Sequence, residues 1–321
     1  MKRVTLQTDY KPHTLSWLND RLIDWSYSGR QYLLNGKTET LGNYGYGFDC
    51  DGAVTSDDGV YAVIYEKLGT KGVLLKNGRM LRELNRSYYQ AHVYEYPANF
   101  FKAQNGKTYL IHCPEEYNLI ELEEVETGKR VKTRKKRKPE DFFHSRFEVS
   151  EDNSMLMSRG WVWHPMDYVE AFNLEECLTN PQLLDRSELC PIADEIDEVF
   201  AGSFIDNESV LIGHNFETNE TNRMAVWHTK NNQISGQLTL DFEIGAHLTV
   251  IDDTFAWDLY EYPKLFNYRT GELVAKAEDI HSGKQASCIF HKRHDLPLIA
   301  INKKTKQVAV ATGETIEVLS M

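Results

Sequence analysis

The feature that most constrains this fold is an internal repeat. Seven segments share one pattern: a strand of alternating apolar residues, a short turn of Asp, Asn and Gly, and a more continuously apolar strand. They are Ser16–Trp25, Ala53–Tyr65, Phe101–Cys113, Phe147–Arg159, Ser203–Asn215, Leu248–Leu259 and Cys288–Asn302. Asp and Asn bond to their own turn backbone and tolerate left-handed conformations. Each polar cluster therefore predicts the reversal of a β-hairpin.

The repeat has the period of a four-stranded unit. The second strands are expected to begin at Leu22, Tyr61, Tyr109, Met155, Val210, Phe255 and Leu298, which are 39 to 55 residues apart. Each hairpin is followed by another strand pair with its own turn, as in GVLLKNGRMLREL and KLFNYRTGELVAK. Four antiparallel strands at this period are typical of a β-propeller blade. We predict an all-β, seven-bladed propeller that forms one domain over residues 1–321.

In general architecture the chain resembles the seven-bladed propellers of WD40-like or quinoprotein-like type. No specific family signature accompanies the resemblance. The WD40 pattern places Gly-His before a blade and Trp-Asp on the third strand, whereas Gly213-His214 and Trp257-Asp258 both fall on expected second strands. Rings of this type close by pairing one terminus with the last blade. We therefore expect Val4–Tyr10 to lie beside Thr315–Leu319.

Charge is distributed unevenly along the chain. The chain has 36 Lys and Arg residues and 48 Asp and Glu residues. Eight of the cations lie within Lys129–Lys138, so the rest of the chain has 28 cations and 48 acids. Nucleic-acid affinity comes mainly from distributed cations that contact phosphates, so we expect no nucleic-acid partner. The basic run follows the acidic stretch Leu119–Glu126 across a Thr-Gly turn. This order predicts a hairpin whose basic strand, 129–138, lies at the sheet edge.

The fourth unit contains an insertion at residues 175–198, rich in Pro and acids, which we expect to hold a short helix. The five cysteines are scattered and never form a CxxC pair, which favours reduced thiols in the cytoplasm. No stretch approaches the roughly 18 uninterrupted apolar residues of a membrane span, so we expect no membrane contact.

No motif indicates a cofactor or a metal site. His291 and His294 form an HxxH, but no further ligand stands at a recognisable spacing, and we interpret them as turn residues. The acidic segment Asp49–Gly59 lacks the spacing of an EF-hand and resembles only the start of one Asp-box, so it is interpreted as an ordinary turn. P-loop, G-x-S-x-G and G-x-G-x-x-G motifs are also missing from the sequence.

The two ends of the predicted ring differ in composition. Loops joining strands one to two and three to four share one end, here called the turn end, and its loops are small and polar. The opposite end, the connection end, carries the loops between strands two and three and between units. It collects four aromatic segments: Asn43–Asp49, Ser87–Pro97, Gly160–Tyr168 and Tyr260–Pro263.

Aromatic side chains with polar tips contribute much of the binding energy at recognition surfaces. We therefore expect a non-catalytic scaffold that holds a protein or peptide partner around the channel at the connection end. The partner is expected to be cationic, because the body of this chain is acidic. We expect this chain to be monomeric when no partner is bound. The predicted binding residues are Tyr44, Tyr46, Tyr88, Tyr89, Tyr94, Tyr96, Trp161, Trp163, His164, Tyr168, Tyr260 and Tyr262. These aromatics can also pack between blades.

An alternative is a propeller glycoside hydrolase or sugar-binding protein, because aromatics beside carboxylates also suit sugars. Its candidate acids at the connection end are Asp49, Asp51, Glu95, Asp167 and Glu261. Hydrolysis would need two of them about 5 to 10 Å apart.

Overall fold

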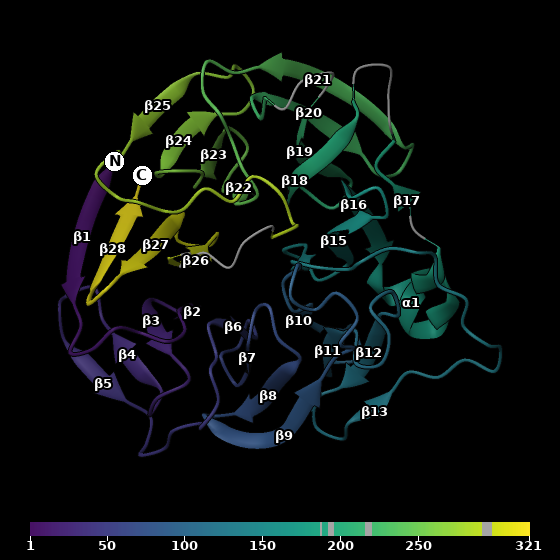
Figure 1. The fold of residues 1–321 in the computed structure, drawn as a ribbon, viewed down its shortest axis with the longest axis horizontal. Coiled ribbons are helices and arrows are strands. Elements are labelled where there is room, and N and C mark those ends of the chain that lie inside the picture. The colour runs from purple at the N-terminus through teal and green to yellow at the C-terminus, as the bar shows by residue number, and fades with distance from the viewer. Residues whose placement is uncertain (187, 192–195, 216–219, 291–296) are drawn as a thin grey trace.

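The computed structural model describes residues 1–186, 188–191, 196–215, 220–290 and 297–321. Its strands form seven four-stranded antiparallel sheets arranged as blades around a centre (Figure 1). The prediction of a seven-bladed β-propeller is confirmed. Among the helices of the described residues, none is both long and apolar enough to cross a membrane.

Blades 1 to 6 follow the order of the chain from their inner to their outer strand, and blade 7 takes its outer strand from the amino terminus. Blade 1 consists of β2 (Ser16–Leu18), β3 (Arg21–Asp24), β4 (Arg30–Tyr32) and β5 (Thr38–Thr40). Blade 2 consists of β6 (Gly52–Thr55), β7 (Tyr61–Tyr65), β8 (Lys71–Lys76) and β9 (Arg79–Asn85). Blade 3 consists of β10 (Ala98–Lys102), β11 (Thr108–His112), β12 (Glu121–Glu124) and β13 (Lys129–Arg130). Blades 4 and 5 consist of β14 (Glu148–Val149), β15 (Met155–Val162), β16 (Met166–Asn173) and β17 (Glu188–Leu189); and β18 (Glu198–Phe204), β19 (Ser209–Asn215), β20 (Arg223–His228) and β21 (Gln233–Thr239). Blades 6 and 7 consist of β22 (Leu248–Val250), β23 (Phe255–Asp258), β24 (Lys264–Asn267) and β25 (Leu273–Lys276); and β26 (Leu298–Asn302), β27 (Gln307–Thr312), β28 (Thr315–Ser320) and β1 (Lys2–Gln7).

Strand β1 closes the ring as the outer strand of blade 7. It pairs with β28 from Lys2 opposite Ser320 to Gln7 opposite Thr315, which confirms the predicted closure. The two termini consequently lie side by side (Figure 1). The last blade differs from the prediction in one respect: the strand that begins at Leu298 is its first strand, not its second.

The core is divided among the interfaces between neighbouring blades. On β7, Tyr61, Val63 and Tyr65 pack against blade 3, whereas the intervening Ala62 and Ile64 pack against blade 1. Successive side chains on a strand point to opposite faces, so a blade with a neighbour on each side needs apolar residues at every position of its central strands. This requirement explains the continuously apolar second strand of each repeat.

The hairpin turns are built by local side-chain hydrogen bonds. In blade 2, Asp58 Oδ1 accepts from Ser56 Oγ at 2.7 Å and from Val60 N at 3.0 Å. In blade 4, Asp152 Oδ1 accepts from Ser150 Oγ at 2.7 Å and from the backbone of Ser154 at 3.0 Å. Carboxylates that accept from nearby turn donors in this way stabilise the reversal.

The two irregular regions lie next to each other. Helix α1 (Leu174–Thr179) and the 3-10 helix η1 (Pro181–Asp185) occupy the insertion of blade 4. The expected basic edge strand is shorter than 129–138, because only Lys129 and Arg130 pair with β12. The rest leaves the sheet, and Arg137 Nε donates to Asp185 Oδ1 of η1 at 2.5 Å.

Candidate functional site

The predicted aromatic residues separate by exposure into three groups. Tyr94, Tyr96, Trp161 and Tyr168 are buried. Tyr44, Tyr46, Tyr260 and Tyr262 are partly exposed. Tyr88, Tyr89, Trp163 and His164 are exposed, with Tyr88 at 86 %. Only the last group is exposed enough for its rings to be contacted directly by a partner.

A stack of aromatic rings supports the exposed group. Phe143 lies parallel to Trp161 with ring centroids 3.8 Å apart, and Tyr117 stacks at 4.1 Å from Phe143. Trp163 meets Phe143 edge-on at 5.6 Å, and Tyr89 stacks on Phe143 at 5.8 Å. Phe143 and Trp161 are fully or almost fully buried, so they fix the exposed rings from below. We define the aromatic patch as Tyr89, Tyr117 and Trp163, whose rings contact one another or Phe143, together with the exposed Tyr88 and His164, which are their sequence neighbours.

Phe143 and Tyr117 were missed by the sequence analysis. Phe143 belongs to the connection between blades 3 and 4, and Tyr117 to the loop between β11 and β12. The rule that assigns loops to the connection end would have included both. Their signals were Phe142-Phe143 directly after the basic run and Tyr117 after two acids.

The turn that carries Trp163 and His164 has an unusual backbone. His164 has φ 95°, although it is not glycine and stands before Pro165. Positive φ is uncommon for residues other than glycine, and backbone of this kind is concentrated at functional sites. The turn joins β15 and β16 at the connection end, where Val162 pairs with Met166.

Acidic side chains lie beside Tyr117 of the aromatic patch. The Tyr117 hydroxyl donates to Asp141 Oδ1 at 2.6 Å, and burial together with this carboxylate raises the pKa of Tyr117. Glu115 and Glu116, which precede Tyr117, are both exposed. Glu115 is paired with Arg130, so the negative charge beside the patch on the side of blade 3 comes from Glu116 and Asp141.

The other predicted aromatics have structural contacts. The guanidinium of Arg86 lies over the rings of Tyr94 and Tyr96, at 4.5 and 5.1 Å from their centroids. It also donates to the carbonyl groups of Ala91 and Tyr94, so the connection between blades 2 and 3 folds around it. Tyr46 donates from its hydroxyl to Gly78 O at 2.8 Å, which joins blades 1 and 2.

The connection between blades 6 and 7 crosses the connection end of the ring (Figure 1). Gln285 O accepts from Ala246 N at 2.9 Å, and Ile289 forms an antiparallel bridge with Tyr94 on the far side. Between them, Cys288 donates from its backbone N–H to Asp167 Oδ1 at 3.2 Å and also from its thiol. The aromatic patch therefore lies beside this crossing segment. His291 and His294 lie outside the described residues.

Four of the five candidate acids of the hydrolase alternative have separate partners. Burial raises the pKa of Asp167, which binds Cys288, to about 6. Glu95 accepts from the Tyr65 hydroxyl at 3.1 Å, Asp51 accepts from Lys67 N at 2.6 Å, and Glu261 forms an ion pair with Lys284. Asp49 is exposed. Within the described residues, no hydrogen bond links any two of these acids.

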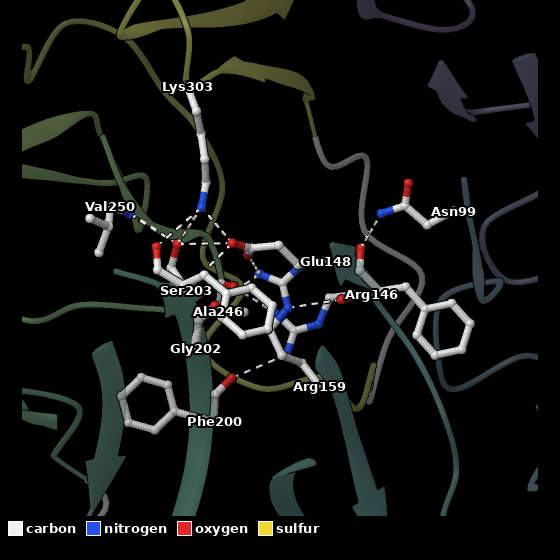
Figure 2. A network of polar contacts seen from close by, with 12 residues as sticks. Asn99, Arg146, Glu148, Arg159, Phe200, Gly202, Ser203, Ala246, Val250 and Lys303 are labelled. Atoms are coloured by element: carbon white, nitrogen blue, oxygen red, sulfur yellow. Dashed lines mark hydrogen bonds and ion pairs between the residues drawn. The ribbon is translucent and has the colours of Figure 1, made fainter. Parts of the chain in front are cut away.

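The central channel opens at the turn end, where the sequence analysis expected only solvated loops. It forms a cavity of about 1140 Å³ lined by residues of all seven blades. A network of charged side chains occupies its wall (Figure 2). Glu148 accepts from Lys303 Nζ at 2.5 Å and from Phe204 N at 3.1 Å, and it lies 3.4 Å from Arg159 Nη1.

Two arginines extend this network toward the centre of the molecule. Arg159 donates from Nε to Arg146 O at 2.8 Å and from Nη1 to Gly202 O at 3.1 Å. Arg146 is 8 % exposed and donates to Ala246 O at 2.8 Å and to Phe200 O at 3.1 Å. Figure 2 shows the two guanidinium groups beside Glu148, with Lys303 approaching from blade 7.

The cations dominate the electrostatics of the channel wall. Burial raises the pKa of Glu148, but the charges of Lys303 and Arg159 outweigh burial and lower it below its ordinary value. Burial and nearby cations, Arg146 first among them, lower the pKa of His247 to about 3. At neutral pH Glu148 is therefore an anion and His247 is uncharged.

Comparison with models of known protein families gave no match, and comparison with curated proteins gave none either. The fold and the side-chain chemistry described above are the basis for a functional proposal.

Proposed function

We propose that this propeller is a non-catalytic scaffold that binds a cationic protein or peptide through the aromatic patch. The observation that carries the proposal is the contrast between the exposed rings of Tyr89 and Trp163 and the buried Phe143–Trp161 stack that they contact. Exposed rings on a rigid support lose little conformational entropy when a partner covers them. Such pre-organised aromatics are typical of binding hot spots.

Charge supports a cationic partner. The chain has a formal net charge of −12. Glu116, which precedes Tyr117, and Asp141, which accepts from the Tyr117 hydroxyl, are both exposed. A negative rim accelerates the encounter with a positive partner and disfavours negative ones. The aromatic rings would then supply most of the affinity.

A cytoplasmic location is part of the proposal. All five cysteines are free and buried. Buried thiols without disulfide partners suit a reducing compartment. We also propose that the protein is monomeric before it meets its partner.

The hydrolase or sugar-binding alternative has less support. It requires a pair of carboxylates that act on one bond. Each of Glu95, Asp167 and Glu261 instead engages its own protein partner.

Binding of defined peptides tests the proposal. The immobilised protein is titrated with a library of short peptides that vary in net charge, and affinities are compared with those of a Tyr88→Ala, Trp163→Ala variant. Tyr94 is unsuitable for this test because its ring is buried. Met80→Ala is the matched control, since Met80 is 55 % exposed but begins the outer strand of blade 2 near the turn end.

We expect cationic peptides to bind the intact protein and the Met80→Ala variant equally. The double variant should bind them about tenfold or more weakly, because truncation of hot-spot aromatics costs about 2 kcal/mol or more. Equal affinity for all three proteins, or a preference for acidic peptides, would contradict the proposal.

A further inference from the structure

The wall of the central channel holds more positive charge than its protein partners neutralise. Arg159 and Lys303 share a single carboxylate, that of Glu148, and Arg159 also donates to the backbone carbonyl of Arg146. Arg146 itself donates only to carbonyl groups. Buried charges are costly unless they are paired, so an excess of cations beside a cavity favours an anionic ligand.

Donors remain available for such a ligand. Arg159 lines the cavity, its side chain is 14 % exposed, and within the described part of the chain nothing accepts from its Nη2. Arg146 Nε is buried and likewise has no acceptor there. His247 also lines the cavity and uses Nε2 toward Gln285 at 3.0 Å. A guanidinium with a free edge suits a carboxylate, which it binds with charge-assisted hydrogen bonds.

The mouth of the same cavity has the opposite charge. Its lining includes Asp57, Asp152 and Asp206, contributed by the turns of blades 2, 4 and 5, and Asp252 of blade 6, which is paired with Lys306 at 2.7 Å. Carboxylates at the mouth repel a polyanion and attract a cationic amine. The volume of about 1140 Å³ is slightly larger than the usual range of small-molecule sites, about 300 to 1,000 Å³, so a small ligand fits with room to spare.

From this arrangement we propose that the channel binds a small zwitterionic molecule of amino-acid-like chemistry. Its carboxylate contacts Arg159 inside the channel, and its ammonium group faces the acidic mouth. This site opens at the turn end, so it is independent of partner binding at the aromatic patch.

Three probes of equal chain length test this site: 5-aminopentanoate, pentanoate and pentylamine. Each is titrated into the full chain at low salt and followed by calorimetry and ligand-observed nuclear magnetic resonance. We expect 5-aminopentanoate to bind about tenfold more tightly than either singly charged probe, because only it satisfies both charged regions. Binding of pentanoate at least as tight as that of 5-aminopentanoate, or no binding of the zwitterion at millimolar concentration, would overturn the proposal.

Variants locate the binding site. Lys303→Met removes one cation and leaves Glu148 to neutralise Arg159, so binding of 5-aminopentanoate should weaken about tenfold. Lys304→Met is the matched control, since Lys304 is exposed in the same turn at the channel mouth, and it should bind within about twofold of the parent. Arg159→Gln should also lose binding of 5-aminopentanoate. Because Arg159 donates to two carbonyl groups, Arg159→Gln can fail to fold, and Lys303→Met is then the decisive variant. Unchanged binding in Lys303→Met would exclude this site.

Discussion

Lys264 and Asp258 form an ion pair in the interior of blade 6, with Nζ 2.6 Å from Oδ2 and with 2 % and 0 % of the two side chains exposed. Asp258 also accepts from Gly245 N at 2.8 Å and from Tyr260 N at 3.1 Å. Burial outweighs the effect of Lys264 and raises the pKa of Asp258 above its ordinary value. The pair fixes the loop of Tyr260 and Tyr262, whose carbonyl groups accept from Lys264.

Lys264→Met should destabilise the protein strongly. It leaves a buried carboxylate without its cation, which costs about 3 to 5 kcal/mol of unfolding free energy. The double variant Asp258→Asn, Lys264→Met should recover part of this loss. Lys284→Met, in the exposed pair with Glu261 on the same side of the blade, should change the unfolding free energy by less than about 1 kcal/mol. Urea denaturation measures all three, and equal midpoints for Lys264→Met and Lys284→Met would contradict the expectation.

The amino-terminal strand should be required for full stability. Leu6 on β1 is 3 % exposed and packs at the interface of blades 7 and 1. Leu6→Ala should lower the unfolding free energy by about 2 to 4 kcal/mol. Val4→Ala on the same strand is the control, because Val4 is 36 % exposed. Deleting residues 1–7 should lower the melting temperature further, since it leaves the edge of β28 unpaired. A truncated protein with an unchanged melting temperature would refute the role of β1.

The fold could be predicted because its signals are local. Turn chemistry and apolar alternation lie within each hairpin, and Tyr61, Met155 and Phe255 begin second strands as expected. The first strand of blade 7 was placed wrongly at Cys288–Phe290, because this segment has the apolar pattern of a strand. It is apolar for another reason, since it crosses the ring and contacts Asp167 and Tyr94. An apolar run does not distinguish a strand from a covering segment.

The candidate site was less predictable because burial depends on distant contacts. Tyr88 and Tyr94 lie in the same connection and belong to the same residue type, yet they are 86 % and 0 % exposed. Tyr94 is buried because it packs against Arg86 and Phe143. The channel network is still less local, since Lys303 reaches Glu148 from blade 7.

Replacing Lys132, Arg134, Lys135 and Lys136 by Gln should leave nucleic-acid binding unchanged. All four side chains are exposed outside the edge strand, whereas Arg137 is tied to Asp185. The remaining body is acidic, so little phosphate affinity exists to lose. Fluorescence anisotropy with labelled duplex DNA and single-stranded RNA at two salt concentrations measures this. Tight, salt-dependent binding by the intact protein that the variant loses would reverse the assignment.

Mild acid should destabilise the protein through buried histidines. Burial lowers the pKa of His112, and it lowers the pKa of both His144 and His247 to about 3. Between a pH of about 6.5 and a pH of about 3, the unfolded chain binds a proton at His144 and at His247 and the folded chain does not. The unfolding free energy therefore falls as pH decreases, by about 1.4 kcal/mol per pH unit for each such histidine. Asp167, whose folded pKa is raised to about 6, acts in the opposite direction over the same range.

His144→Gln isolates one of these contributions. The amide can still bond to Ser158 Oγ, which lies 3.1 Å from His144 Nδ1. Between pH 6 and 5 the unfolding free energy of the variant should fall less steeply than that of the parent. The two slopes should differ by about 1.4 kcal/mol per pH unit, whatever the stability of the variant at neutral pH. His92→Gln, at an exposed position, is the control and should keep the parent slope. Urea denaturation at several pH values gives the slopes. Equal slopes for the parent and His144→Gln would contradict the prediction. They would mean that His144 binds its proton as well in the folded chain as in the unfolded chain, although burial should lower its pKa in the folded chain.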